Sequence, residues 1–87
     1  MKTIWKFKFE INDNFELSMP KNAEILTIQI QNNIPCIWAI IDSDQLSEIR
    51  YFELYGTGHL LKESKKKYIG SFRMYNDSLI FHLFENI

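Results

Sequence analysis

Hydrophobic and polar residues alternate along most of this chain. Near the N-terminus Trp5, Phe7 and Phe9 occupy every second position, and lysines fill the positions between them. Because successive side chains of a β-strand point to opposite faces of a sheet, a period of two predicts a strand with one buried face. The same reasoning, with one almost wholly apolar run at 36–41, predicts strands over 4–11, 15–19, 25–31, 36–41, 50–55, 68–75 and 79–84.

Residues that favour turns separate these segments. Asn12-Asp13-Asn14, Asn32-Asn33 and Asn76-Asp77-Ser78 each fall between two predicted strands, and short Asx side chains tolerate tight backbone geometry. The segment 44–50 is the one place for a helical turn, and it is too short for an independent helix. The pattern therefore predicts an all-β fold. We expect a small single-domain β-sandwich or partly open barrel of about seven short, mainly antiparallel strands, in which the first two strands form a hairpin.

Length and charge limit the class of protein. With 87 residues the chain is expected to form one domain, 1–87. Its formal net charge is -1, from 10 Lys and Arg against 11 Asp and Glu, which argues against general nucleic-acid binding. No apolar run approaches the ~20 residues of a membrane helix, and the N-terminus lacks the apolar region of a signal peptide. We therefore expect a soluble, cytoplasmic protein that does not associate with a membrane.

Cys36 is the only cysteine, which excludes an internal disulfide and argues against a thiolate metal site. A domain this small has a thin core, which proteins often reinforce by oligomerisation. Unpaired strand edges also recruit other strands, and Lys6 and Lys8 would protect only one edge. We therefore predict a homodimer or a higher homo-oligomer.

The sharpest local feature is Gly56-Thr57-Gly58-His59, which directly follows a predicted strand. Glycines let backbone N–H groups approach an anion closely, Thr57 adds a hydroxyl donor, and His59 can pair with a phosphate. The alternative is a structural turn that needs positive φ and in which His59 makes a structural hydrogen bond. The sequence leaves both interpretations open.

Three further residues would complete a phosphate site at this turn. Arg50 is a candidate bidentate phosphate ligand, Tyr55 would stack on a base, and Lys62 would raise the local positive potential. Lys62 also begins a lysine-rich loop at 62–67, and charge blocks of this kind usually lie solvated at the surface.

The other chemically active residues favour structural roles. Trp5 and Trp38 are expected in the core, since aromatics at strand spacing usually fill cores or interfaces. His82 is expected on the polar side of an edge or interface strand. The two histidines have no spacing typical of a metal site, and no nucleophile–base pair is visible. We therefore expect no metal, no cofactor and no catalytic residue, and hence no enzyme.

Several segments, taken in order and spacing, resemble a known family. They are MKTIWKF at 1–7, MPKNAEIL at 19–26, the strand NNIPCIWAI at 32–40, YGTGH at 55–59, YIGSF at 68–72 and IFHLFE at 80–85. The chain is similar to small uncharacterised proteins that tailed bacteriophages and prophages encode, described only as a domain of unknown function. The resemblance implies a phage origin, a single domain and action in the host cytoplasm. It implies no catalytic or binding residue.

Two functions fit these observations. The first is sequestration of an anionic, nucleotide-type small molecule, by which a phage protein would counter a host defence function. The second is a protein–protein inhibitor or adaptor that acts on a host enzyme through an exposed sheet edge or aromatic face. A concave pocket that collects Arg50 and the 56–59 turn would favour the first, and a flat apolar patch would favour the second.

Overall fold

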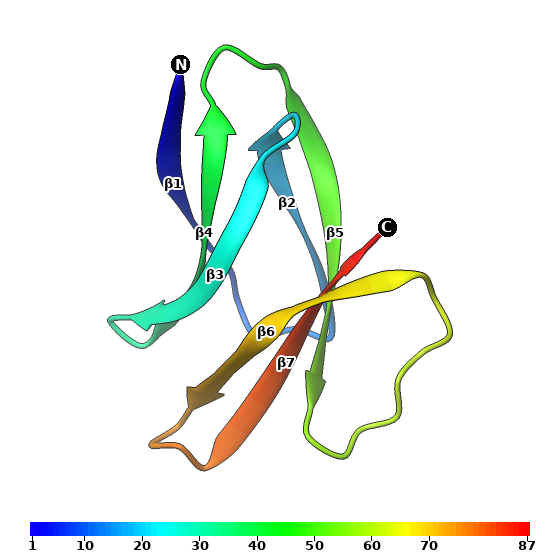
Figure 1. Cartoon of the computed structure of the whole chain (residues 1–87). Coiled ribbons are helices and arrows are strands. Elements are labelled where there is room, and N and C mark those ends of the chain that lie inside the picture. Colours follow the sequence, from blue (N-terminus) through cyan, green and yellow to red (C-terminus); the bar gives the residue numbers. More distant parts are fainter.

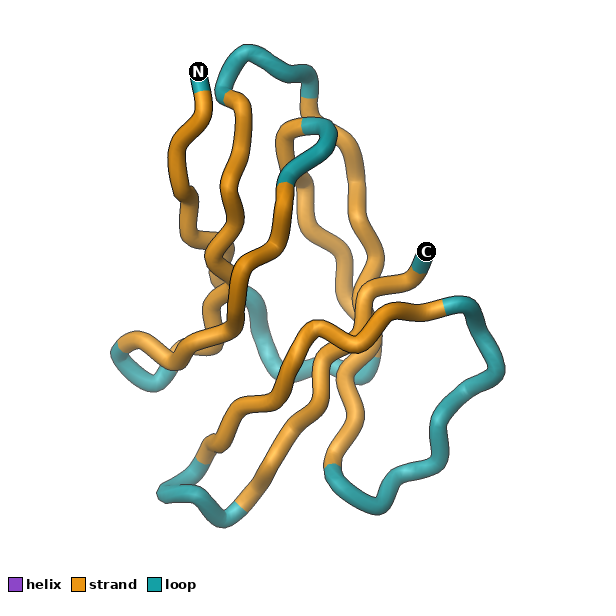
Figure 2. Tube along the Cα trace, in the orientation of Figure 1, coloured by secondary structure: helices purple, strands orange, loops and turns teal.

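The computed structural model describes all residues, 1–87, and contains seven strands joined by turns and loops (Figures 1 and 2). The strands are β1 (Lys2–Lys8), β2 (Asn14–Pro20), β3 (Glu24–Gln31), β4 (Ile34–Asp42), β5 (Ser47–Gly56), β6 (Lys66–Met74) and β7 (Leu79–Asn86). They pair antiparallel throughout, in one sheet of order β1-β4-β3 and another of order β2-β5-β7-β6. The all-β prediction is confirmed, and the two sheets of the protein pack as a sandwich. No helix capable of crossing a membrane is present.

The core lies between the two sheets and consists of side chains at alternate strand positions. In β2, for example, Phe15 and Met19 point inward while Glu16 and Ser18 point to solvent, as the period of two predicts. The buried cluster comprises Phe9, Met19, Ala23, Ile28, Ile37, Ala39, Ile41, Phe52, Leu54, Phe72 and Leu83. The partly buried Phe15 stacks between two rings of this cluster, with its ring centroid 4.5 Å from that of Phe9 and 5.1 Å from that of Phe52.

The prediction that the first two strands form a hairpin is wrong. β1 pairs with β4 in one sheet, whereas β2 pairs with β5 in the other. The connecting segment 9–13 crosses the end of the sandwich, since Phe9 is buried in the core and its N–H donates to the Pro35 carbonyl at 3.1 Å. At the other end of this segment the Asp13 carbonyl accepts from the Leu54 N–H of the second sheet, at 2.9 Å. A crossing connection and a hairpin turn carry the same Asn-rich signal in the sequence.

The prediction that both tryptophans lie in the core is also wrong. Trp5 belongs to the edge strand β1 and remains 44% exposed. Trp38 points to the outer face of β4, half-buried, and the Lys6 ammonium lies 5.9 Å from the centre of its ring. Cys36, by contrast, is fully buried, as its apolar strand predicts.

Candidate functional site

The turn at 56–59 has a separate structural reason for each of its glycines. Gly58 has φ +91°, a conformation that residues with a Cβ rarely adopt. Gly56 lies under the His59 ring, where an added Cβ would be 3.0 Å from the ring carbon Cε1. The Gly56 N–H donates to His59 Nδ1 at 3.3 Å, and the His59 N–H donates to the Gly56 carbonyl at 3.1 Å. His59 therefore makes a hydrogen bond that shapes the turn.

Thr57 is fastened to the neighbouring strands. Its N–H donates to the Ile80 carbonyl at 3.2 Å, and its hydroxyl lies 2.9 Å from His82 Nε2. The other ring nitrogen of His82, Nδ1, lies 3.1 Å from the Tyr68 hydroxyl. His82 faces outward as predicted. Because β7 lies between β5 and β6, the edge alternative of the expected edge or interface strand is wrong. The His82 imidazole connects three strands or their extensions on this face.

Arg50 lies near the other end of β5 and is bonded inside the sandwich. Its Nε and Nη2 donate to the two carboxylate oxygens of Glu85 at 2.5 and 2.7 Å, and its Nη1 donates to the Ala23 carbonyl at 2.5 Å. The hydrogen bonds that Arg50 donates to Glu85 raise the pKa of Arg50. The guanidinium thus joins β5 and β7 of one sheet to the segment before β3 of the other, away from the 56–59 turn.

Tyr55 and Lys62 belong to a different network, centred on the buried carboxylate of Glu53, which is only 4% exposed. Glu53 accepts hydrogen bonds from the Tyr55 hydroxyl at 2.5 Å, the Ser64 hydroxyl at 2.7 Å and the Asn86 side-chain amide. The Lys66 ammonium lies 3.4 Å from the same carboxylate. These five residues, Glu53, Tyr55, Ser64, Lys66 and Asn86, are called the Glu53 clamp below.

The Glu53 clamp holds a charged group where burial alone would neutralise it. Burial raises the pKa of Glu53, but the bonds from Tyr55, Asn86, Ser64 and Lys66 outweigh it and lower that pKa to about 2. The pKa of Tyr55 is raised, first by burial and then by its bond to Glu53. The carboxylate is therefore ionised at any physiological pH.

The clamp also fixes the path of the 57–65 loop. The Lys62 N–H donates to the Tyr55 hydroxyl at 3.1 Å, and the Lys66 ammonium donates to the Lys62 carbonyl at 2.5 Å. The Lys62 ammonium itself points toward β2, where it donates to the Asn14 side chain at 3.2 Å. The structure therefore divides the predicted site residues into three groups. Gly56, Thr57, Gly58 and His59 form the turn, Tyr55 and Lys62 belong to the network around Glu53, and Arg50 lies apart from both.

Sequence reasoning did not identify the clamp. Glu53 occupies an outward position of its strand, where an acidic residue ordinarily meets solvent. Its burial comes from the loop that folds back over this face, and the loop has no periodic pattern. The one signal in the sequence is Lys66, which the lysine-rich pattern predicts to be solvated and which is buried beside Glu53 instead. Elsewhere, the His, Cys, Asp and Glu side chains form no cluster of three that could ligate a metal ion.

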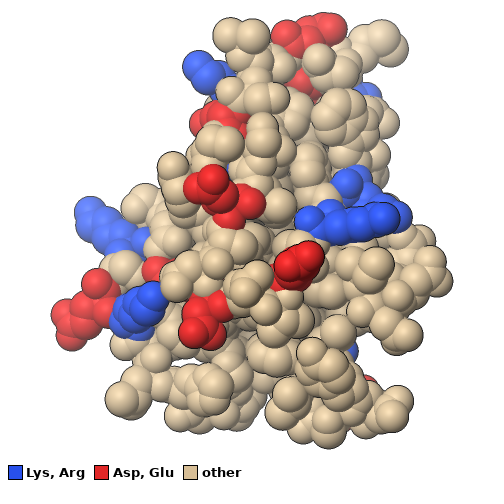
Figure 3. All heavy atoms as spheres, turned by 180° about the vertical axis from the view of Figure 1, so that it is seen from behind, with Lys and Arg blue, Asp and Glu red and all other residues tan.

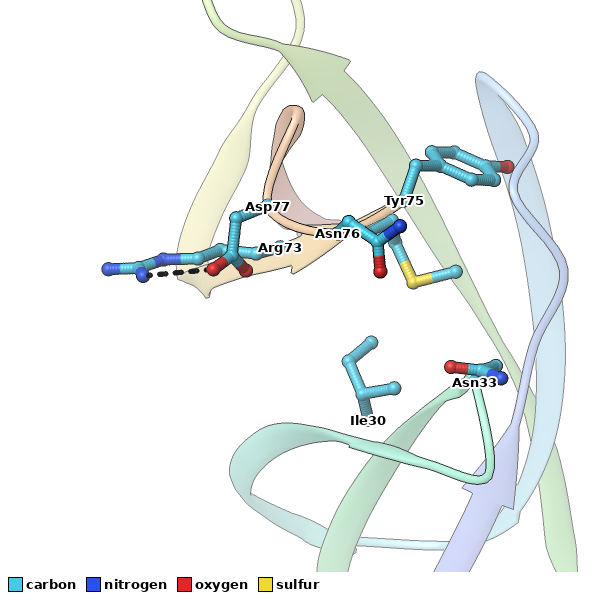
Figure 4. Close-up of a pocket in the computed structure, with 7 residues that line it drawn as sticks. Ile30, Asn33, Arg73, Tyr75, Asn76 and Asp77 are labelled. Atoms are coloured by element: carbon cyan, nitrogen blue, oxygen red, sulfur yellow. Dashed lines mark ion pairs between the residues drawn. The ribbon is translucent and has the colours of Figure 1, made fainter.

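One surface hollow adjoins the 56–59 turn, and a larger one lies elsewhere on the molecule. A small one of about 310 Å³ lies beside the 56–59 turn and is lined by Gly56, Thr57, His59, Ser78, Leu79, Ile80 and Phe81. A larger one of about 770 Å³ lies between the β3–β4 and β6–β7 turns (Figure 4) and is lined by Ile30, Asn33, Arg73, Met74, Tyr75, Asn76 and Asp77. Arg50 lines neither of them.

Four exposed apolar side chains lie near the small hollow, where Leu79 and Ile80 belong to its lining and Leu60 and Leu61 follow His59 in the loop. Leu60 is 94% exposed, and Leu61, Leu79 and Ile80 are between 43% and 56% exposed. These four residues are called the apolar patch. Seen from behind, charged side chains of both signs occupy the upper and middle parts of the molecule and leave most of its lower end uncharged (Figure 3). The β6–β7 turn and the beginning of the loop after β5 lie at that lower end (Figure 1).

Comparison with known families gives one match. The model of a family described as a domain of unknown function, DUF7352, matches residues 1–87. No curated protein and no solved structure matches the chain. The function therefore has to be argued from the residues themselves.

Proposed function

The chain belongs to the DUF7352 family, a domain of unknown function, and we propose that it is a non-catalytic binding protein that attaches to another protein through its apolar patch. The observation that carries this proposal is the exposure of Leu60, Leu61, Leu79 and Ile80 at one end of the molecule. These residues form two adjacent pairs, one in the loop after β5 and one at the start of β7, and exposed apolar side chains grouped in this way mark interaction surfaces in soluble proteins. Truncating such residues has its largest effect where they are central to an interface.

Rigidity of the surrounding segments supports the same function. The Glu53 clamp holds the far end of the 57–65 loop, and the bonds of Thr57 and His59 hold its near end. Leu60 and Leu61 thus stand on a short segment fastened on both sides. A pre-organised surface loses less conformational entropy on binding than a flexible one.

The biological setting of the proposal comes from the motif resemblance. We propose that the protein is encoded by a bacteriophage and acts in the host cytoplasm. Its apolar patch binds a host enzyme, which the protein inhibits or links to another protein as an adaptor. We also propose that it assembles as a homo-oligomer, since β1, β3, β2 and β6 all have an unpaired edge. Size-exclusion chromatography with light scattering tests the assembly, and a monomeric mass would contradict it.

The test of the partner is affinity capture from a bacterial lysate with the immobilised protein. A variant carrying Leu60→Asp and Leu79→Asp is expected to lose the captured protein, because a carboxylate in an apolar interface is costly to bury. The matched control is Leu46→Asp, at an exposed leucine of the β4–β5 turn outside the patch. Equal capture by the patch variant and the wild type, with both variants folded, would contradict the proposal.

A second candidate function is capture of an anionic, nucleotide-type molecule at the 56–59 turn. One observation favours it: apart from the adjoining residues Thr57 and His59, no atom lies within 4 Å of the position that a Cβ of Gly58 would occupy, so this side of the turn is open. Arg50 and Lys62 are bonded elsewhere, so only Thr57 and His59 would offer side chains to it. Calorimetric titration with adenine and guanine nucleotides tests this candidate, and His59→Ala should abolish any binding found.

A further inference from the structure

A groove crosses the end of the sandwich between two turns, apart from the apolar patch. Two hollows of about 770 and 630 Å³ adjoin there and share Asn33, Met74 and Tyr75. In Figure 4 the Asn76 and Asn33 side chains approach each other from the β6–β7 turn above and the β3–β4 turn below. Ile30 and Met74 supply apolar surface to the lining.

The Asn33, Tyr75 and Asn76 side chains of this groove are exposed to solvent. The amides of Asn33 and Asn76 and the hydroxyl of Tyr75 make no hydrogen bond within the chain. Arg73 and Asp77 form only a loose ion pair of 3.9 Å, with more than half of each side chain exposed. Each amide can both donate and accept, the guanidinium donates and the carboxylate accepts. The groove therefore presents both donors and acceptors, of which only Arg73 and Asp77 are paired within the chain.

Both turns that border the groove contain residues with positive φ. Asn33, Tyr75, Asn76 and Asp77 have φ between +55° and +64°. Asn and Asp tolerate this left-handed region, but a tyrosine does not adopt it readily. Backbone strain of this kind clusters at ligand-binding sites. Tyr75 is therefore the strained position of the groove, and it lines both hollows.

The charge of the groove selects against an ionic ligand. Lys8 and Arg73 are balanced by Glu10 and Asp77 among the lining residues. A phosphate would gain nothing from a pair of opposite charges, and a purely apolar molecule would leave the amides unpaired. A neutral molecule with many hydroxyl groups and one apolar face satisfies both conditions.

We propose that this groove binds a neutral sugar. The Asn33 and Asn76 amides each pair with hydroxyls of the ring, as donor to one and acceptor from the next. Asp77 accepts from a hydroxyl and Arg73 donates to one, while the C–H face of the ring packs on Met74. A site built to hydrogen-bond hydroxyls rejects analogues that lack them.

Saturation-transfer NMR with glucose, galactose, mannose and N-acetylglucosamine tests the proposal. At least one of these sugars is expected to receive saturation from the wild-type protein. Asn33→Gly with Asn76→Gly should abolish that transfer, because glycine keeps the left-handed backbone and removes both amides. The matched control is Asn22→Gly, at an exposed asparagine with φ 66° outside the groove, which should leave the transfer unchanged.

Three results would overturn the proposal. They are no transfer to any of the four sugars, equal transfer in the double variant, or displacement of a bound sugar by inorganic phosphate. The leucine variants that test the apolar patch should keep sugar binding, so the two sites can fail separately.

Discussion

Two regions of the molecule use their polar side chains in opposite ways. Around the 56–59 turn and the Glu53 clamp, the Thr57, His59 and Tyr55 side chains are all bonded to other parts of the chain. In the groove between the β3–β4 and β6–β7 turns, the amides of Asn33 and Asn76 are bonded to none. The comparison separates polar side chains that hold the chain together from polar side chains that face solvent.

The two regions also differ in their ion pairs. Lys66 and Glu53 lie 3.4 Å apart with side chains 9% and 6% exposed, whereas Arg73 and Asp77 lie 3.9 Å apart and are largely in solvent. Exposed pairs contribute little, since water competes for both charges. Breaking a buried pair leaves an uncompensated charge, which is costly. Stability should therefore depend on the clamp, while the groove residues remain open to ligand.

The largest expected effect is that of Lys66→Met. Methionine keeps most of the lysine volume but leaves the Glu53 carboxylate buried without its cation. We expect the free energy of unfolding to fall by about 4 kcal/mol, as when other buried pairs lose one partner. Urea denaturation followed by tryptophan fluorescence measures this change. Lys67→Met, at the exposed neighbouring lysine, should stay within about 0.5 kcal/mol of the wild type. Equal effects at the two positions would contradict the clamp.

The second-largest expected effect is a loss of stability at low pH, where the Glu53 carboxylate becomes protonated. Glu53 has its pKa lowered from 4.5 to about 2, so the folded state binds this proton less readily than the unfolded chain. The contribution is present above pH ~4.5 and is lost as the pH falls toward ~2, at about 1.4 kcal/mol per pH unit and about 3 kcal/mol in all. Urea denaturation at a series of pH values measures it. Glu53→Gln should remove this part of the pH dependence, and an unchanged slope in that variant would assign it to other groups.

Much of the fold follows from the period of two. The strands around Phe15, Ile28 and Phe52 lie where their alternation predicts, because one buried face leaves little freedom in register. The pairing of the strands could not be predicted in the same way, since it depends on which strands lie side by side in space. Asn12 to Asn14 has the composition of a hairpin turn, yet burial of Phe9 carries the chain to the other sheet.

Only part of the candidate site could be predicted from the sequence. Gly58 and His59 have the turn roles that their types indicate, since both act within a few residues of the chain. The partners of Arg50 could not be predicted, because Glu85 is distant in sequence and carries no distinguishing pattern. The groove was equally hidden, since Asn33 and Asn76 each belong to an ordinary turn and meet only through the packing of the two sheets.

The two glycines of the 56–59 turn should respond differently to alanine. Gly58→Ala forces a Cβ into φ +91°, and we expect it to lower the free energy of unfolding by about 1–2 kcal/mol. Gly56→Ala meets only the exposed His59 ring, at 3.0 Å, which can rotate away at the loss of one weak hydrogen bond. It should cost less than about 1 kcal/mol. Thermal unfolding by circular dichroism compares the two, and the reverse order would contradict a positive-φ role for Gly58.

The smallest effect has the opposite sign and lies in the groove. Tyr75 has φ 57° and is mostly exposed, so Tyr75→Gly removes steric strain and little packing. We expect the free energy of unfolding to rise by about 0.5–1 kcal/mol. Asn76→Gly is the matched control at the next position, where the native residue already tolerates φ 55°, and it should change stability less. Urea denaturation of both variants decides the point. A gain at Tyr75 would mean that the fold keeps this tyrosine at a cost in stability, as binding sites do, whereas a loss would mean that its ring packs to stabilise the turn.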